Sequence, residues 1–220
     1  MTNAEWDAVD RYLVQTMVSD ADNDVLDANA AAGLPAIDVS PAQAKFLHLI
    51  ARTMGARRVL EIGTLGGYST LWLARAVGPQ GRVITMEYEP KHAEVARTNL
   101  DRKGVGEWVD IRVGAALDNL PVLEQEGGDP FDLVFIDADK VNNANYVRWG
   151  LRLTRPGSVI IVDNVVRGGK ITNGHSEEAA VRASREVLEL MDSEPRLDAT
   201  ALQTVGSKGW DGFAYALVTG

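Results

Sequence analysis

The sequence predicts an α/β fold with a doubly wound, mostly parallel sheet. After residue 55, short apolar segments alternate with segments of helical periodicity, and runs such as "LVFI" and "VIIV" are apolar without a break. Strands that alternate with helices imply parallel strands joined by crossover helices. Uninterrupted apolar strands are typical of a sheet that is covered on both faces.

The first 55 residues predict helices. Apolar residues of the first segment recur at helical spacing: Trp6, Val9, Leu13 and Met17. A second helix is expected within residues 20–35, where Gly33 and Pro35 end it. In the third, Ser40 is the expected N-cap, and the proline that follows it suits the first helical position. Gly55 closes this helix.

The remaining chain divides into strands, helices and a closing hairpin. The expected strands are residues 57–62, 81–87, 108–113, 131–137 and 158–164, and the helices are 66–77, 90–104, 115–128 and 143–157. A helix at 177–194 then precedes two strands, 197–205 and 212–220, joined by "GSKGWD". These two form an antiparallel hairpin on the sheet edge, which makes the sheet seven-stranded. We expect one domain over residues 1–220, with a helical cap (1–55) and a core (56–220).

Composition excludes several classes of function. There are no cysteines, so disulfides, zinc thiolates and cysteine nucleophiles are absent. The net charge of −9 disfavours a nucleic-acid partner. The N-terminus lacks a signal-peptide pattern, and no window approaches the roughly 20 apolar residues of a membrane span. We therefore expect a cytoplasmic protein that binds neither nucleic acid nor membrane.

A glycine-rich turn, "VLEIGTLGGYS", predicts a ligand site after the first strand. Ligands of doubly wound sheets bind at the carboxyl ends of the strands. The turn lacks the dinucleotide pattern G-x-G-x-x-G, and Glu61 precedes its first glycine, Gly63. A carboxylate here would repel a pyrophosphate and favour a cationic ligand. Glu87 ends the next strand, where an acid commonly binds ribose hydroxyls. By itself the turn is equally compatible with a generic nucleotide fold, and Glu87 favours a nucleoside.

A second group of polar residues predicts a metal site. One strand ends in Asp137, and the next ends in Asp163 and Asn164. If the two strands are neighbours, their tips lie about 4.8 Å apart. Carboxylate and amide oxygens suit Mg²⁺, although Mn²⁺ and Ca²⁺ also accept them.

Lys140 follows Asp137 by three residues and is a candidate base. An amine that is partly desolvated and close to a dication has a lowered pKa, so it can accept a proton near neutral pH. The alternative is that "DADK" forms a solvated turn with a local ion pair. His48, His92 and His175 are scattered along the chain, and we interpret them as structural.

Four motifs in this order and spacing resemble the class I, metal-dependent O-methyltransferases, which include catechol and caffeoyl-coenzyme A O-methyltransferases. They are "VLEIGTLGGYS", "TMEYEP", "VFIDADK" and "IIVDN". The resemblance covers residue 37 to the C-terminus and implies a Rossmann-like fold and S-adenosylmethionine as methyl donor. It implies that Glu61 and Gly63 line the donor pocket near the methionine part. It also implies that Ser69 contacts the methionine carboxylate and Glu87 holds the ribose.

Further roles follow from the same resemblance. Ala115 and Ala116 would contact the adenine, and Ile37 and Val39 would cover the cofactor. The resemblance makes Asp137, Asp163 and Asn164 the metal ligands, places Asp137 also beside the cofactor, and makes Lys140 the catalytic base. The acceptor implied is a catechol-type or phenolic small molecule.

The chain departs from the family pattern at three places that leave the substrate open. Asn143 stands where relatives often have tyrosine, and the hairpin carries Lys208 and Trp210 where relatives usually have a shorter turn. The glycines of residues 167–174 predict a mobile loop over the site.

The alternatives are a nicotinamide-dependent oxidoreductase and a non-catalytic S-adenosylmethionine-binding protein. The missing dinucleotide pattern and the retained metal set count against them. The apolar stripes of the N-terminal helices favour a homodimer, the alternative being packing on the same chain.

Overall fold

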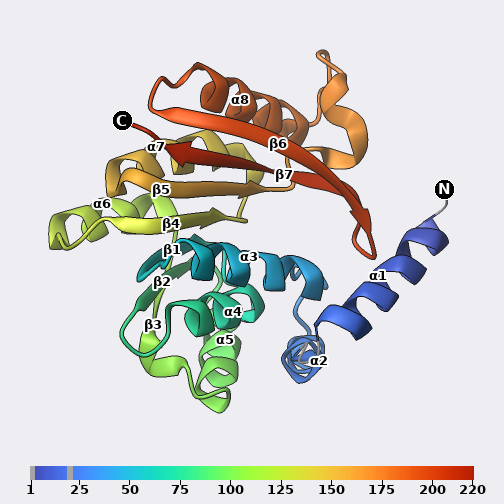
Figure 1. Ribbon diagram of the computed structural model, residues 1–220, viewed down its shortest axis with the longest axis vertical. Helices are drawn as coiled ribbons and strands as arrows, with labels where there is room; N and C mark the ends of the chain where they lie inside the picture. The colour runs from blue at the N-terminus through green and yellow to red at the C-terminus, as the bar shows by residue number, and fades with distance from the viewer. Residues whose placement is uncertain (1–2, 19–21) are drawn as a thin grey trace.

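The computed structural model describes residues 3–18 and 22–220 (Figure 1). Its helices are α1 (Asn3–Met17), α2 (Asn23–Ala31), α3 (Pro41–Thr53), α4 (Tyr68–Val77), α5 (Pro90–Arg102), α6 (Ala116–Glu126), α7 (Asn143–Leu153) and α8 (Ala179–Ser193). Its strands are β1 (Arg58–Ile62), β2 (Arg82–Glu87), β3 (Val109–Val113), β4 (Phe131–Ile136), β5 (Thr154–Asp163), β6 (Leu197–Gly206) and β7 (Gly209–Val218). Short 3-10 helices are η1 (Gly106–Trp108), η2 (Lys140–Asn142) and η3 (Arg167–Thr172).

Within the described residues the strands form one seven-stranded sheet in the order β3-β2-β1-β4-β5-β7-β6. The pairs β1–β2, β1–β4, β2–β3 and β4–β5 are parallel. β7 runs antiparallel to both β5 and β6. The order reverses at β1, so the carboxyl ends of β1 and β4 flank the switch point at which such sheets bind ligands. This confirms the predicted fold class, including the C-terminal hairpin.

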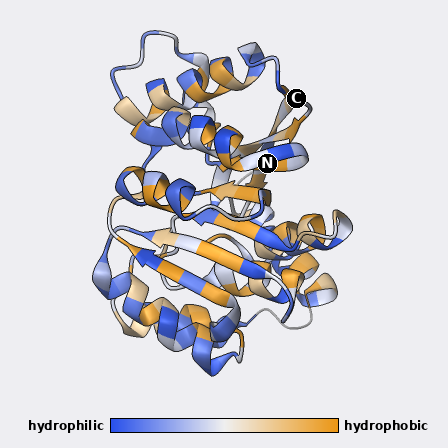
Figure 2. Ribbon diagram, turned by 90° about the vertical axis from the view of Figure 1, so that its left-hand side faces the viewer, coloured by the Kyte–Doolittle hydropathy of each residue, from blue (hydrophilic) through white to orange (hydrophobic). Residues whose placement is uncertain are grey.

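Alternate residues of the strands build two cores, one on each face of the sheet. Val59 and Phe135 pack with α3, α4 and α5 on one face. Leu60 and Ile136 pack with α6, α7 and α8 on the other. Figure 2 shows apolar residues along the central strands and mixed colouring on the helices that cover them. Because both faces are buried, the strands are apolar throughout, as the sequence predicted.

The start of α3 is fixed by its capping residue. Ser40 Oγ accepts a hydrogen bond from the backbone amide of Gln43 at 3.2 Å, and Pro41 occupies the first turn. The helix ends before Gly55, whose φ of 66° is the left-handed conformation that favours glycine. This cap matters to the site because Gln43 also reaches Asp163, as described below.

Two boundaries differ from the sequence prediction. β5 begins at Thr154, because residues 154–157 extend the strand across an irregularity in its pairing with β4. The hairpin turn is shorter than expected: Gly206 pairs with Gly209, so Trp210 lies in β7 and not in the turn. The glycines near residue 206 predicted a longer turn than the structure has, because the pairing of β6 with β7 continues up to Gly206 and Gly209.

Of the two N-terminal helices, α1 lies beside the hairpin and α3, and α2 packs against α5. α1 extends away from the body of the molecule (Figure 1), and its Asp10 accepts a hydrogen bond from the backbone amide of Ser207 at 2.7 Å. In the described part of the chain, no helix has the length and apolar character needed to cross a bilayer.

Truncation of Leu133 tests the contribution of the central strands. Leu133 on β4 is completely buried, whereas Leu202 on β6 is 53% exposed. We expect Leu133→Ala to lower the free energy of unfolding by about 2–5 kcal/mol, because it leaves a cavity. Leu202→Ala is the matched control and should change it by less than about 0.5 kcal/mol. Urea denaturation measures both, and equal losses would contradict a core centred on β4.

Candidate active site

A cavity of about 530 Å³ opens at the carboxyl ends of β1, β2 and β4. Most of the predicted site residues line it: Ile37, Val39, Gly63, Ser69, Glu87, Ala115, Ala116, Asp137, Lys140 and Asn164. Residues that are far apart in the chain therefore meet at one edge of the sheet, as the parallel topology requires. Two predicted residues, Glu61 and Asp163, lie outside this lining.

The glycine turn lies close to the tip of β4. Gly63 has a φ of 100°, and a Cβ atom there would overlap the carbonyl oxygen of Asp137. The backbone amide of Asp137 donates to the carbonyl of Ile62 at 2.8 Å. Only glycine permits both the conformation and the close approach. The first glycine of the motif therefore sets the width of the cavity between β1 and β4.

Glu87 organises the same turn through its carboxylate. Its Oε2 accepts hydrogen bonds from the backbone amides of Thr64 (3.1 Å) and Leu65 (2.7 Å), and its Oε1 accepts one from Glu89 (3.0 Å). His92 Nδ1 lies 3.4 Å from Oε1. Glu87 therefore lines the cavity and at the same time holds the turn in place, a second role that the sequence motif did not predict.

Glu61 is completely buried behind the cavity wall. Its carboxyl group accepts hydrogen bonds from the hydroxyls of Ser69 (2.6 Å), Thr70 (2.5 Å) and Thr85 (2.7 Å). Burial raises the pKa of Glu61 from 4.5 to about 7 despite these hydrogen bonds. The sequence placed Glu61 in the lining, but here it supports the lining residue Ser69 from behind.

Asp137 and Asp163 bring two carboxylates to adjacent strand tips. Lys140 Nζ donates to Asp137 Oδ1 at 2.8 Å. Asp163 accepts from Gln43 Nε2 at 2.7 Å and from the backbone amide of Asn164 at 2.8 Å. Burial, followed by the negative charge of Asp137, raises the pKa of Asp163 to about 7. β4 and β5 are neighbours, which confirms the condition on which the predicted convergence depended.

A second cavity of about 360 Å³ lies on the other side of Asp163 and Asn164. It is bounded by α1, α3 and the hairpin, and its lining includes Phe46, Phe213, Val205, Gln43, Asp10, Asp211 and Lys208. Asn164 lines both cavities. The tip of β5 therefore separates a larger cavity over the glycine turn from a smaller one that is partly aromatic.

The donor set at this point suits a hard cation. Asp137, Asp163 and Asn164 offer carboxylate and amide oxygens, and a dication would counteract the burial and the negative charge of Asp137 that raise the pKa of Asp163. No group of three or more His, Cys, Asp or Glu side chains suited to a metal occurs among residues 3–18 and 22–220. A metal site here would need the amide of Asn164 as a third protein ligand, and such a set of oxygens would suit Mg²⁺ better than Zn²⁺.

The structure adds cavity residues that sequence reasoning missed. Tyr146 and Arg167 line the larger cavity, and so does His92, which we had interpreted as structural. The hydroxyl of Tyr146 donates to Asp139 Oδ1 at 2.5 Å, and burial raises the pKa of Tyr146. Tyr146 lies in the first turns of α7, which follows the predicted site residues Asp137 and Lys140. For Arg167 the signal was the glycine-containing segment 167–174, which predicted a loop over the site but did not single out this side chain.

The segment from Arg167 to Thr172 lies where a covering loop was expected. Asp211 Oδ1 accepts hydrogen bonds from the backbone amides of Val166 (3.0 Å) and Arg167 (2.9 Å). A Cβ atom at Gly169 would overlap the ring of Trp210. Trp210 and Asp211, both on β7 of the hairpin, therefore hold this segment in place. Mobility of the segment stays a prediction.

The other departures from the family pattern have distinct positions. Lys208 lines the smaller cavity, and its Nζ donates to the carbonyl of Ala36 at 3.3 Å. Asn143 is fully buried at the start of α7, and its side-chain amide has no hydrogen-bond partner in the described structure. We find no physical account of that buried amide.

The comparisons with known proteins decide the family. The family model described as O-methyltransferase matches residues 19–210. The chain belongs to the O-methyltransferase family. A catechol O-methyltransferase of Mycobacterium tuberculosis is 60% identical to this enzyme over 212 residues, which are 96% of this chain and 94% of that protein.

Two solved structures of O-methyltransferases share the fold closely. One, from Bacillus cereus in complex with SAH, has a TM-score of 0.97 and 51% identity, and the match covers 99% of this enzyme and 100% of that chain. The other, TomG from Streptomyces achromogenes in complex with SAM, has a TM-score of 0.96 and 46% identity, and both chains are fully covered. The family assignment decides against the oxidoreductase and the non-catalytic protein.

Replacing Glu61 tests its shifted pKa. A buried carboxyl whose pKa is raised stabilises the fold below pH 4.5, and this contribution is lost as the pH rises to about 7. We expect Glu61→Gln to flatten the fall in unfolding free energy over that window by on the order of 3 kcal/mol. Urea titrations at several pH values measure it. The exposed Glu94→Gln is the control and should follow wild type, and an unchanged slope in Glu61→Gln would contradict the shift.

Proposed function

We propose that this enzyme transfers a methyl group from S-adenosylmethionine to a hydroxyl of a catechol-type aromatic small molecule. The single observation that carries the proposal is that Asn164 lines both cavities, so that donor and acceptor would meet at the tips of β4 and β5. We propose that the whole chain acts as one catalytic domain.

The larger cavity suits the donor. Its volume of about 530 Å³ lies within the range of cofactor sites. Glu87 offers a carboxylate where ribose hydroxyls would bind, and Ala115 and Ala116 leave room for a flat base. Structures of related O-methyltransferases in complex with SAH and with SAM support this assignment. S-adenosylmethionine supplies its methyl group from a positively charged sulfur, which the carboxylate of Asp137 in the cavity lining would favour.

The smaller cavity suits a flat, partly apolar acceptor. Phe46 and Phe213 lie with their ring centroids 5.6 Å apart, and both line this cavity. An aromatic ring that packs against them would direct its hydroxyls toward Asp163 and Asn164. The name of the Mycobacterium tuberculosis relative supports a catechol as the class of acceptor.

Lys140 is the proposed base. Its Nζ takes the proton of the acceptor hydroxyl, the oxygen forms a bond to the methyl carbon, and the bond from that carbon to sulfur breaks. A dication held by Asp137, Asp163 and Asn164, most simply Mg²⁺, would lower the pKa of a hydroxyl beside it. Lys140 is paired with Asp137 in this structure, so a carboxylate that turns toward a cation would free the amine.

The base and the metal are tested by one set of assays. We expect Lys140→Met to lower kcat for methylation of catechol by about 10²- to 10⁴-fold, with the dissociation constant of S-adenosylmethionine changed less than about twofold. Lys91→Met, at an exposed position of α5, is the matched control.

EDTA and Asp137→Ala should each abolish turnover, with Mg²⁺ restoring only the EDTA-treated wild type. Turnover that is unchanged in the presence of EDTA would overturn the metal assignment.

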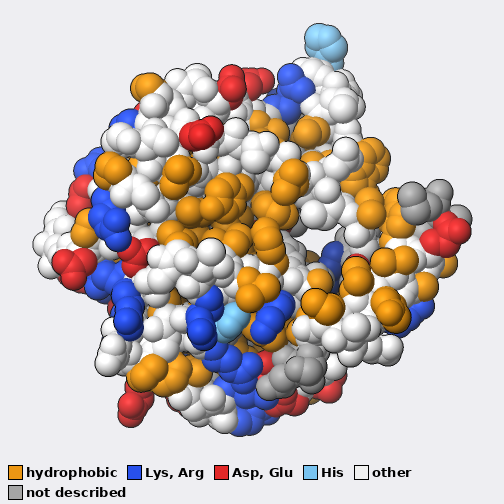
Figure 3. Space-filling model, viewed as in Figure 1, with side chains coloured by type: hydrophobic (Ala, Val, Ile, Leu, Met, Phe, Trp, Pro, Cys, Tyr) orange, Lys and Arg blue, Asp and Glu red, His pale blue; other side chains and the backbone are white. Residues whose placement is uncertain are grey.

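We also propose a homodimer built on α1. Its exposed apolar residues are Val9, Tyr12, Leu13 and Met17, and Figure 3 shows hydrophobic side chains over this projecting helix at the right of the view. An exposed apolar stripe of this kind marks an interaction surface.

Light scattering after size exclusion tests the dimer. We expect wild type at twice the mass of 23.8 kDa, and Tyr12→Lys as a monomer, because a charge would be desolvated in the interface. Gln15→Lys, also exposed on α1, is the control. A monomeric wild type, or a dimer in both variants, would contradict the assignment to this face.

A further inference from the structure

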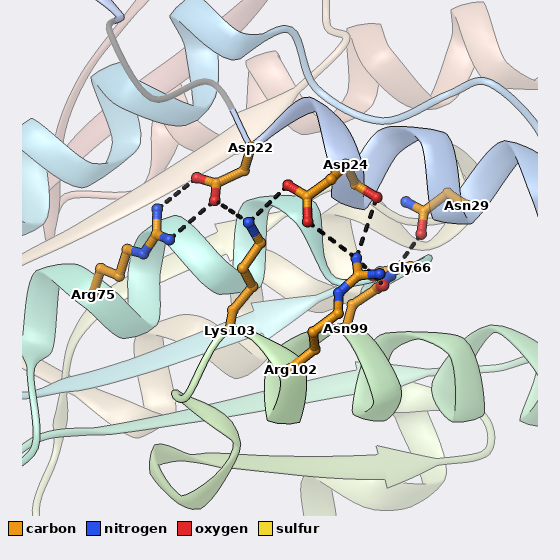
Figure 4. A network of polar contacts seen from close by, with 8 residues as sticks. All are labelled: Asp22, Asp24, Asn29, Gly66, Arg75, Asn99, Arg102 and Lys103. Atoms are coloured by element: carbon orange, nitrogen blue, oxygen red, sulfur yellow. Dashed lines mark hydrogen bonds and ion pairs between the residues drawn. The ribbon is translucent and has the colours of Figure 1, made fainter.

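A network of polar contacts joins the N-terminal cap to the glycine turn of the larger cavity (Figure 4). It runs from α2 across α5 to the carbonyl of Gly66, and its two central members are the amides of Asn29 and Asn99. Each of these residues is 2% exposed. A buried amide that is hydrogen-bonded to other protein groups is held in a specific position, because moving it would leave those groups unpaired.

Asn29 uses both ends of its amide. Its Nδ2 donates to Asp38 Oδ1 at 2.8 Å, and its Oδ1 accepts from Asn99 Nδ2 at 2.9 Å. Asn99 Nδ2 also donates to the carbonyl of Gly66 at 2.9 Å. Asp38 lines the larger cavity and is the residue between Ile37 and Val39. One side chain of the cap therefore contacts the covering segment directly and the glycine turn through Asn99.

Gly66 touches Asn29 at close range. A Cβ atom at Gly66 would overlap the amide of Asn29, although the backbone of Gly66 lies outside the left-handed region. The second glycine of the motif is thus required by the approach of α2. Because the backbone of Gly66 has an ordinary conformation, glycine is needed here for the close approach of Asn29 and not for backbone strain.

Ion pairs hold α2 in the register that places Asn29. Asp22, whose side chain is completely buried, pairs with Arg75 Nη1 at 2.5 Å and with Lys103 Nζ at 2.8 Å. Lys103 also pairs with Asp24 at 2.7 Å. Arg102 donates to the carbonyl of Asp24 at 3.2 Å and to Asn99 Oδ1 at 3.1 Å. The start of α2 is fastened to α4 and α5, so Asn29 cannot shift without breaking these contacts.

We propose that Asn29 is a positioning residue for the cofactor cavity. Its side chain holds Asp38 on one wall of the cavity and, through Asn99, Gly66 on another. The inference rests on the proposed function only in naming the ligand of that cavity. The occupied cavity and the docked α2 then stabilise each other, because a coupling between two sites acts in both directions. A residue that only fastened α2 to the body would leave ligand affinity unchanged.

Calorimetric titration with S-adenosylhomocysteine tests the proposal. We expect Asn29→Ala to raise its dissociation constant about tenfold, the effect of losing one buried hydrogen bond to a charged partner. The KM for S-adenosylmethionine should rise equally, with kcat and the acceptor KM within about twofold of wild type, because the reacting groups are untouched. Asn23→Ala, the same change at an exposed position of α2, should bind as wild type.

Two further variants separate positioning from folding. Asn29→Asp keeps the shape and the acceptor for Asn99 but places a carboxylate against Asp38, so it should weaken binding at unchanged secondary structure. Gly66→Ala should weaken binding by displacing Asn29, and its effect should shrink in the Asn29→Ala background, because the overlapping amide is gone. Additive effects of Gly66→Ala and Asn29→Ala, or wild-type affinity of Asn29→Asp, would overturn the proposal.

Amide hydrogen exchange keeps the two proposals distinguishable. In ligand-free protein, Asn29→Ala should speed exchange at residues 64–67 while Asn23→Ala does not. A wild type that fails to bind S-adenosylhomocysteine would refute the proposed function but leave this readout intact. Unchanged exchange at residues 64–67 in Asn29→Ala would refute the positioning role whatever the ligand.

Discussion

The parallel pairing of β1 with β4 is the constraint on which the site depends. It brings Gly63 against the carbonyl of Asp137, where a Cβ atom would not fit. The same pairing sets how far the glycine turn stands from the acidic tip of β4. If the donor binds over the turn and the acceptor beyond Asp163, as we propose, this pairing would bring the two reactants together at the strand tips.

This arrangement buries carboxyl groups at two places, which is unfavourable for their ionised form. Glu61 and Asp163 both lie in the dry interior, and burial raises the pKa of each to about 7. For Glu61, hydroxyls from α4 and β2 offset part of that cost, whereas for Asp163 the neighbouring Asp137 adds to it. A cation bound beside such carboxyl groups would favour their ionised form, and both the proposed sulfonium donor and a divalent metal are cations.

The N-terminal helical cap contributes side chains that contact residues of the site, in addition to its role in the fold. Gln43 on α3 reaches Asp163, and Asn29 on α2 reaches Asp38. The hairpin makes a comparable contribution from the other side, since Asp211 anchors the segment that carries Arg167 into the larger cavity. Regions outside the four sequence motifs therefore shape both cavities.

The sequence by itself determined the fold class, because apolar periodicity and glycine turns are local signals. Residues at the strand ends predicted part of the cavity lining, namely Gly63, Glu87, Asp137, Lys140 and Asn164, and the family resemblance added Ile37, Val39, Ser69, Ala115 and Ala116. Only the tertiary structure decided that Glu61 stands behind the wall, that Trp210 lies in a strand, and that His92 and Arg167 face the cavity. Those facts depend on contacts between segments distant in the chain, and no local pattern records which surfaces will meet.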